Sequence, residues 1–137
     1  MIEVAGTTRA PAARIWAVYE DTATAPDWDP LVGEIRPDGP LELGRTAHNK
    51  PRRGPAMPST ITELTAGTSY TESIRVPGAI LHWSHTLTAG PDGVTAIRHG
   101  VRCEGALAGV YALLYQRSFH RGMRVALDNL IARVETT

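Results

Sequence analysis

A long C-terminal segment without proline most constrains the fold of this chain. From residue 107 to about 134 the sequence has no proline and only two glycines. We predict one helix of about 28 residues, about 40 Å long. Apolar residues at helical spacing form a stripe that should face the domain, made of Tyr115, Phe119, Met123, Ala126 and Leu130. The opposite face should meet water and carries Arg117, Arg121, Arg124, Asp128 and Glu135.

The first apolar residues of this helix have a different phase. Leu107, Val110 and Leu114 do not lie on the stripe that continues toward the C-terminus. We therefore expect either a kink near Gln116 or a first turn that is buried on several sides.

The chain before this helix predicts one strand, two short helices and six further strands. Residues 2–8 predict the first strand, and residues 12–20 predict a helix that starts after Pro11. Residues 22–28 could add a second short helix. Turn signals at 37–40, 66–67, 77–78 and 90–93 separate segments of β-type composition. The six predicted strands lie near 32–36, 43–50, 58–65, 69–76, 79–88 and 94–104.

Composition narrows the class of protein. The 137 residues fit a single domain over 1–137, and 14 basic and 14 acidic side chains give zero net charge, which does not favour nucleic-acid binding. No apolar run approaches the roughly 20 residues of a membrane span, and no signal peptide opens the chain. The single Cys103 excludes an intramolecular disulfide and fits a reducing compartment. We expect a cytoplasmic protein, and the sequence leaves a homodimer open.

The predicted order of elements is that of the helix-grip fold, an α+β fold of β-α-α-β6-α order in which a curved antiparallel sheet wraps around a long C-terminal helix. Residues 25–32, APDWDPLV, resemble the P-x-W-x-P-x-V stretch of the SRPBCC superfamily (START/Bet v 1-like, polyketide cyclase/dehydrase group). Leu43-Gly44 is similar to its L-x-x-G segment. Residues 105–109, which lead into Arg117, Arg121 and residues 127–130, resemble the arginine-rich C-terminal helix of bacterial members.

This resemblance implies a deep cavity between the sheet and the long helix that takes a hydrophobic small molecule. The superfamily includes aromatase/cyclases that act on poly-β-ketone chains, and also lipid and hormone binders. The resemblance therefore implies a hydrophobic ligand or substrate and no cofactor. It does not decide between an enzyme and a carrier, because one fold can serve many functions.

Alternation along the predicted strands marks the side chains that should face this cavity. The inner set of residues 69–76 includes Tyr70 and Glu72, that of 79–88 includes Trp83 and His85, and that of 94–104 includes His99. A two-residue turn at 77–78 places Glu72 opposite Trp83 and Tyr70 opposite His85. A loop centred on Pro91 places Trp83 opposite His99, which makes His85 and His99 diagonal neighbours about 7–8 Å apart.

This patch suggests general acid–base chemistry with His85, His99 and Glu72 as the catalytic residues. A histidine can take and give a proton near neutral pH, and burial would raise the pKa of Glu72. Removal of a proton alpha to a carbonyl, with Tyr70 as a hydrogen-bond donor to the enolate, would permit cyclisation or dehydration of a β-keto substrate. The alternative is a polar seam whose members only satisfy one another.

Aromatic residues are the remaining candidates for the cavity wall. We expect substrate contacts from Trp28, Tyr70, Trp83, Tyr111, Tyr115 and Phe119. For Trp28, and for the three aromatic residues of the long helix, plain core packing is the alternative. Asn49 could also point inward from its strand.

Metal binding is not expected, although His85, His99 and Glu72 could in principle form a set of two histidines and one carboxylate. The 50–58 segment, with Lys50, three prolines and two arginines, is expected to be a solvated loop that could gate the cavity or contact a carrier. Three functions remain open: a cyclase or dehydratase of polyketide-like molecules, a non-catalytic binder or carrier of a hydrophobic ligand, and an interaction protein that uses the outer sheet face.

Overall fold

The order of elements along the chain agrees with the prediction from the sequence. The computed structural model describes residues 1–136. Its strands are β1 (Ile2–Thr8), β2 (Glu34–Arg36), β3 (Thr46–Lys50), β4 (Met57–Thr65), β5 (Ser69–Val76), β6 (Ala79–Ala89) and β7 (Thr95–Glu104). Its helices are α1 (Ala12–Glu20), the short 3-10 helices η1 (Thr22–Asp27) and η2 (Pro91–Gly93), and α2 (Ala108–Glu135). The second short helix predicted over 22–28 is thus a 3-10 helix.

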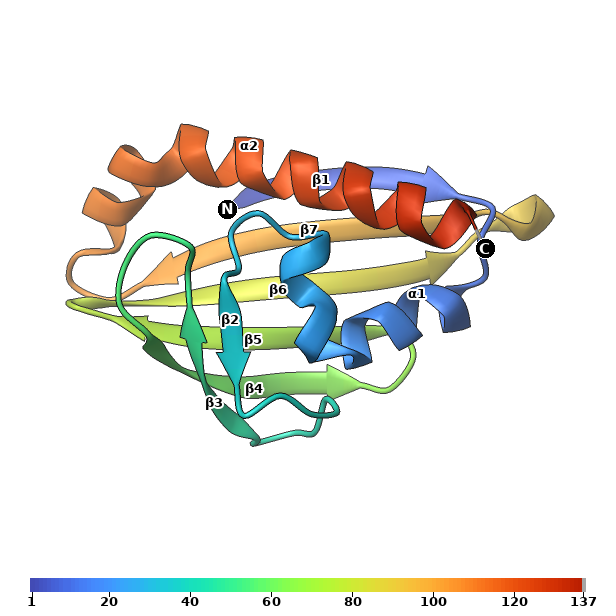
Figure 1. The fold of residues 1–137 in the computed structure, drawn as a ribbon. Coiled ribbons are helices and arrows are strands. Elements are labelled where there is room, and N and C mark those ends of the chain that lie inside the picture. Colours follow the sequence, from blue (N-terminus) through green and yellow to red (C-terminus); the bar gives the residue numbers. More distant parts are fainter. Residues whose placement is uncertain (137) are drawn as a thin grey trace.

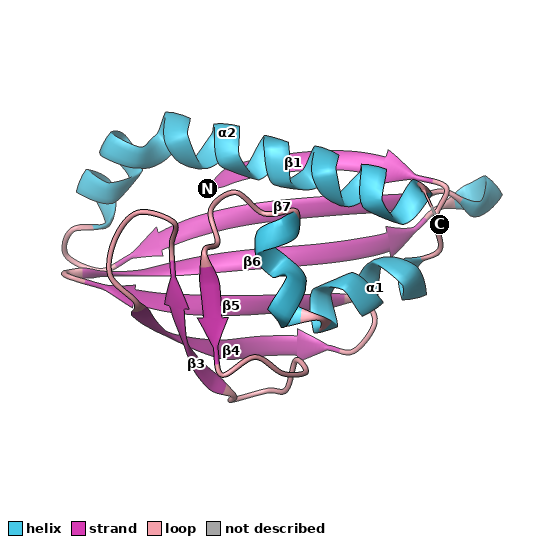
Figure 2. Ribbon diagram, in the orientation of Figure 1, coloured by secondary structure: helices cyan, strands magenta, loops and turns pink. Residues whose placement is uncertain are grey.

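The seven strands form one antiparallel sheet in the order β1-β7-β6-β5-β4-β3-β2. Figure 1 shows α2 lying along β1 and β7 on one face of the curved sheet, with α1 on the same side near one end. The 3-10 helix η1 contacts α1 and β2. Figure 2 shows the loop between β3 and β4 rising toward the start of α2. The predicted α+β helix-grip fold is confirmed. Within residues 1–136 no helix combines the length and the apolar character that crossing a membrane requires.

The C-terminal half of α2 anchors the helix to the sheet. Its buried side chains belong to the core cluster and are Met123, Ala126, Leu127, Leu130 and Val134. Gly122 permits Leu31 to pack closely against α2, because a Cβ atom at position 122 would come within 2.6 Å of Leu31 Cδ2. Arg124 Nη1 donates a hydrogen bond to the carbonyl oxygen of Ala5 at 3.0 Å, which ties α2 to β1.

The first half of α2 differs from the expectation. The helix runs without interruption through Gln116, and Leu107, Val110 and Leu114 are exposed rather than buried on several sides. The reason is that this half of the helix covers a cavity instead of a filled core. Its inward side chains line that cavity, and the off-phase apolar residues point elsewhere.

The register of the central strands was predicted correctly on one side and wrongly on the other. Glu72 pairs with Trp83 and Tyr70 with His85, as the turn at 77–78 predicted. His85, however, pairs directly with His99, and Trp83 pairs with Val101. The β6–β7 loop is centred on Asp92 rather than Pro91, since Ala89 pairs with Thr95, and both Asp92 and Gly93 have positive φ in this turn. The two histidines are therefore directly opposite one another and are not diagonal neighbours.

Candidate functional site

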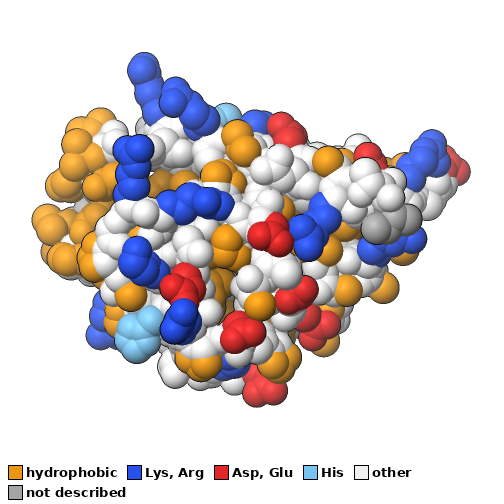
Figure 3. All heavy atoms as spheres, viewed as in Figure 1, with side chains coloured by type: hydrophobic (Ala, Val, Ile, Leu, Met, Phe, Trp, Pro, Cys, Tyr) orange, Lys and Arg blue, Asp and Glu red, His pale blue; other side chains and the backbone are white. Residues whose placement is uncertain are grey.

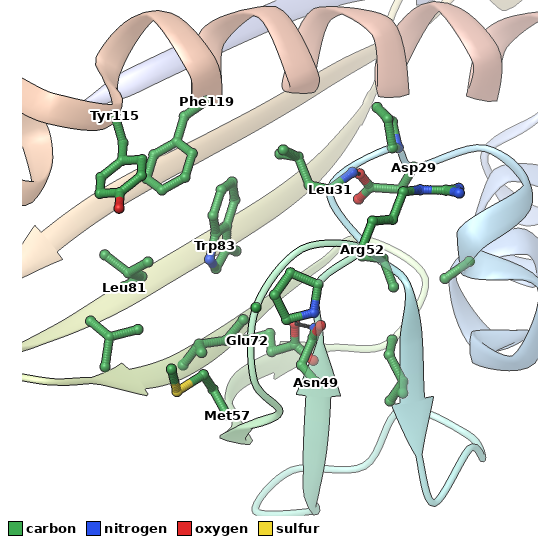
Figure 4. Close-up of a pocket in the computed structure, with 18 of the residues that line it drawn as sticks. Asp29, Leu31, Asn49, Arg52, Met57, Glu72, Leu81, Trp83, Tyr115 and Phe119 are labelled. Carbon is green, nitrogen blue, oxygen red and sulfur yellow. Dashed lines mark hydrogen bonds between the residues drawn. The ribbon is translucent and has the colours of Figure 1, made fainter.

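A cavity of about 710 Å³ lies between the sheet, the first half of α2, and the segments around η1 and the β3–β4 loop. Its wall is mainly apolar and aromatic, with a few polar groups at defined places. Figure 4 shows Trp83 and Phe119 on one side of this space, and Glu72 and Asn49 on another. Such a mixture of apolar lining and few polar groups is typical of small-molecule sites.

Glu72 is the polar centre of the cavity wall. It projects from β5 and accepts a hydrogen bond from Asn49 Nδ2 of β3 at 3.2 Å. Burial raises the pKa of Glu72 to about 7; the Asn49 hydrogen bond opposes this shift, and the nearby Asp29 adds to it. The carboxyl group can therefore be protonated at neutral pH, which makes it able to donate a proton.

Asp29 is a second carboxyl group in the cavity wall. It follows η1, and its Oδ1 accepts a hydrogen bond from the backbone N–H of Leu31 at 2.9 Å. Burial raises the pKa of Asp29 to about 6, while the Leu31 N–H and the positive charge of Arg52 oppose the shift. Figure 4 shows Arg52 extending toward Asp29 from the β3–β4 loop. Arg52 Nη2 also donates to the carbonyl oxygen of Pro26 at 2.6 Å, which fixes that loop against the η1 region.

His85 lines the cavity from β6 and packs among other rings. Its imidazole stacks on Tyr70, with ring centroids 4.2 Å apart and planes within 5°. Tyr19 of α1 meets it edge-on at 5.3 Å. Burial, together with the neighbouring His99, holds the pKa of His85 well below its usual range. Its Nδ1 atom is buried and has no hydrogen-bond partner among the described residues. His85 is thus a neutral imidazole with one unpaired nitrogen.

His99 lies behind the cavity wall and does not line the cavity. Its side chain is only 4% exposed, and its Nε2 lies 2.7 Å from Tyr19 Oη within hydrogen-bonding distance. Burial lowers the pKa of His99 to about 4, and Arg124 adds to the shift. Its ring centroid lies 4.7 Å from that of His85. His99 is therefore placed to fix Tyr19 and His85, and the cavity lining does not include it.

The aromatic wall of the cavity continues along α2. Trp83 of β6 meets Phe119 edge-on at 5.0 Å, and Tyr115 stacks on Phe119 at 5.4 Å. Tyr111, one turn earlier, donates its hydroxyl to the carbonyl oxygen of Pro77 at 2.8 Å and so joins α2 to the β5–β6 turn. The Nε1 atoms of Trp83 and of Trp28 are buried and have no partner among residues 1–136. These two indole N–H groups are donors that a ligand could satisfy.

The sequence-predicted residues therefore separate into two groups. The cavity lining contains Trp28, Tyr70, Glu72, Trp83, His85, Tyr111, Tyr115 and Phe119, but His99 lies outside it. Sequence reasoning missed Tyr19 of α1 and Asp29 after η1, and it considered Arg52 only as part of the 50–58 loop, whereas Arg52 lines the cavity. Within the described residues no three His, Cys, Asp or Glu side chains gather as a metal site, so His85, His99 and Glu72 do not form the set considered above.

Replacing Glu72 with glutamine should stabilise the protein at alkaline pH. The folded pKa of about 7 exceeds the ordinary value of 4.5, so folding favours the protonated form. The associated stability is fully present below about pH 4.5 and is lost as the pH rises through 7. We expect Glu72→Gln to raise the free energy of unfolding by about 3 kcal/mol at pH 8, with little change at pH 4.5.

Urea denaturation of both proteins at the two pH values measures this difference directly. The comparison with wild type matters because the depressed pKa values of His85 and His99 make the wild-type stability fall as the pH drops below 6.5. This change has the opposite sign and would mask the effect of Glu72 in wild type alone. Glu63→Gln, at an exposed carboxylate on β4, is the control and should change little. Equal stability of wild type and Glu72→Gln at pH 8 would mean that water solvates Glu72.

Comparisons with known proteins agree with this geometry. The family model described as "Polyketide cyclase / dehydrase and lipid transport" matches residues 1–135. Among curated proteins, none matches the sequence of this chain. Solved structures do resemble it at low sequence identity, which bears on the fold alone.

Three of these structures illustrate the range. The hypothetical protein jhp0584 from Helicobacter pylori superposes with a TM-score of 0.78 at 11% identity, over 96% of this chain and 86% of that one. Ara h 8.0201 gives 0.72 at 16% identity, over 98% and 97%. The di-domain ARO/CYC StfQ from the steffimycin biosynthetic pathway gives 0.71 at 14% identity, over 98% of this chain and 44% of that one.

The family model matches nearly the whole chain, and the curved sheet around the long helix agrees with it. The fold is also that of Ara h 8.0201 and StfQ. The protein belongs to the polyketide cyclase/dehydrase and lipid transport family of the SRPBCC superfamily.

Proposed function

We propose that the protein binds a hydrophobic, carbonyl-bearing small molecule in its cavity and catalyses a dehydration or cyclisation of it by proton transfer. One observation carries this proposal. Buried polar atoms without partners among the described residues, the indole N–H of Trp83 and Nδ1 of His85, border the mainly apolar cavity. An unpaired buried donor costs free energy, and a carbonyl oxygen of a ligand would offset that cost.

The two titratable groups of the wall suit opposite roles in such a reaction. Glu72 has a raised pKa of about 7 and His85 a depressed one, so a protonated acid and a neutral base coexist at neutral pH. Since Glu72 pairs with Trp83, two residues before His85 on the same face of β6, the two side chains are diagonal neighbours about 7–8 Å apart at Cα. A substrate of a few carbon atoms can lie between them.

A dehydration would then proceed as follows. His85 removes the proton alpha to the ketone, and the indole N–H of Trp83 donates to the developing enolate oxygen. Glu72 protonates the β-hydroxyl group, which leaves as water. His85 ends the step protonated and Glu72 ionised, and proton return between them completes the cycle. The Tyr19–His99 pair acts behind this site as a positioning contact for His85.

A non-catalytic binder or carrier is the second candidate function. The stacking of His85 on Tyr70 favours it, because rings packed at 4.2 Å also serve as a passive wall. Both candidates expect a ligand in the same cavity. They differ in whether a bound β-hydroxyketone is converted, so native mass spectrometry of protein incubated with an aryl β-hydroxyketone separates them by the loss of one water from the ligand.

Replacing Trp83 with phenylalanine tests the proposed ligand class. The variant keeps the aromatic contact with Phe119 but loses the N–H donor. We expect its affinity for an aryl β-hydroxyketone to fall about fivefold to tenfold, the value of one hydrogen bond. Its affinity for the matching aryl hydrocarbon without oxygen should stay within about twofold. Isothermal titration calorimetry with both probes measures the two changes.

The matched control is Trp16→Phe. Trp16 is buried beside Tyr19 and Tyr70 but does not line the cavity, so the substitution should leave both affinities unchanged. If Trp83→Phe weakens both probes equally, Trp83 contributes only apolar contact. If wild type binds neither probe, the cavity does not take this class of ligand and the proposal is wrong.

A further inference from the structure

Exposed apolar side chains gather at the start of α2. We call Leu107, Val110, Leu113 and Leu114 the apolar tip. Leu113 is 80% exposed and Leu114 69%, and the other two are also exposed. Figure 3 shows hydrophobic side chains concentrated at this end of the molecule, where Figure 1 places the first turns of α2. Exposed apolar clusters of this kind mark interaction surfaces, because single exposed residues are ordinary but clusters are not.

Basic side chains follow the apolar tip along the same helix. Arg117 and Arg121 are exposed one to two turns later, and they line a shallow groove between α2 and β1 together with Leu113 and Leu114. Glu3 of β1 also lines this groove, where it pairs with Arg98. Residues 107–127 contain no acidic residue. Neither arginine forms an ion pair with another residue of the part of the chain that is described. Their charge is therefore available to an external anion.

We propose that this end of α2 docks on the surface of an anionic lipid membrane. The apolar tip would enter the boundary between headgroups and acyl chains, and Arg117 and Arg121 would contact lipid phosphates, as amphipathic helices do at interfaces. Tyr111 and Tyr115, in the same turns, line the cavity, so docking would bring the cavity toward the bilayer. The docking surface does not depend on whether the cavity is catalytic.

Charge favours a membrane over a second copy of the chain. In a two-fold dimer built on this face, the same residues of both copies would meet. Arg117 and Arg121 of one copy would then approach those of the other. The acidic residue that lines this groove is Glu3, and it already pairs with Arg98 at 3.7 Å. Anionic lipid headgroups would neutralise these arginines. The attraction is about 1 kcal/mol for each arginine, which raises the affinity for the membrane roughly fivefold per residue.

Sedimentation with lipid vesicles tests the proposal on the full chain without any cavity ligand. The vesicles contain about 70% phosphatidylcholine and 30% phosphatidylglycerol, with pure phosphatidylcholine as comparison. We expect binding to the anionic vesicles, weakened at least about tenfold by the double variant Leu113→Ser, Leu114→Ser. The control is Leu43→Ser, because Leu43 is 66% exposed but lies in the β2–β3 loop. It should bind as wild type does.

A second variant separates the role of charge. Arg117→Gln with Arg121→Gln should weaken binding at low salt by about 25-fold. The control is Arg9→Gln with Arg75→Gln, at exposed arginines just after β1 and on β5, and it should not weaken binding. The proposal is overturned if wild type ignores anionic vesicles. It is equally overturned if the leucine variant binds anionic vesicles as wild type does. That result would mean that the surface attracts anions by charge alone, as a binding surface for an acidic protein would. A monomer–dimer equilibrium abolished by the leucine variant, without vesicle binding, would assign the surface to a second copy.

Because the vesicle assay contains no ketone, its failure leaves the proposed ligand and reaction untouched. Conversely, a protein that binds vesicles but neither probe would retain the docking surface and lose the proposed function. The leucines are exposed and line no part of the main cavity, so their replacement should leave thermal unfolding unchanged.

Discussion

Replacing His85 with asparagine is expected to lower the turnover of an aryl β-hydroxyketone by about 10²- to 10⁴-fold, the range for loss of a positioned general base. Asparagine keeps a polar side chain of similar reach but cannot take the α-proton. The affinity measured by calorimetry should change only a few-fold, since the aromatic wall of Trp83, Phe119 and Tyr115 remains. Appearance of the conjugated enone, followed by ultraviolet absorbance, measures the rate.

Two further histidines sharpen this experiment. His48→Asn alters an exposed histidine on β3 and should leave the rate unchanged. His99→Asn removes the contact with Tyr19 Oη and should lower stability, with a loss of turnover of less than about tenfold, since His99 does not line the cavity. Full turnover in His85→Asn would contradict the assignment of the base. A greater loss in His99→Asn than in His85→Asn would move the chemistry to the Tyr19–His99 pair.

The sequence was most informative where the chain has little freedom. The turn between β5 and β6 has only two residues, Pro77 and Gly78, and Gly78 has a φ of 76°. So short a turn admits one strand register, and the register predicted from it correctly pairs Glu72 with Trp83. The β6–β7 loop is longer and can close in more than one way. Its true centre at Asp92 shifted the pairing by two residues, which kept every side chain on its predicted face but moved His99 to a different partner.

The missed site residues share a physical cause. Tyr19 and Asp29 are brought to the cavity by packing of α1 and of the segment after η1, far along the chain from β5 and β6. Tyr19 lies 80 residues from His99, its hydrogen-bond partner. Alternation and turn lengths describe one sheet, and they carry no information on which helix side chains reach it. The off-phase apolar residues of α2 were visible, but only the structure showed that they are exposed.

Turnover should also fall as the pH rises above about 7. The proposed acid must be protonated, and burial raises the pKa of Glu72 to about 7. Each further pH unit then removes about nine-tenths of the active form, so the rate at pH 9 should be about 100-fold below the plateau. On the acid side the plateau should extend well below pH 6.5, because the pKa of His85 is depressed. Circular dichroism at pH 9 checks that the protein stays folded.

Variants of the two carboxyl groups test the origin of this alkaline fall. Glu72→Gln should have low, nearly pH-independent turnover above pH 7, because glutamine cannot deliver a proton. Asp29→Asn should retain turnover but shift the fall to lower pH, since the Asp29 charge raises the pKa of Glu72 and its removal makes ionisation easier. A wild-type rate that instead increases through pH 7 would mean that ionised Glu72 is the base, and the roles of Glu72 and His85 would be exchanged.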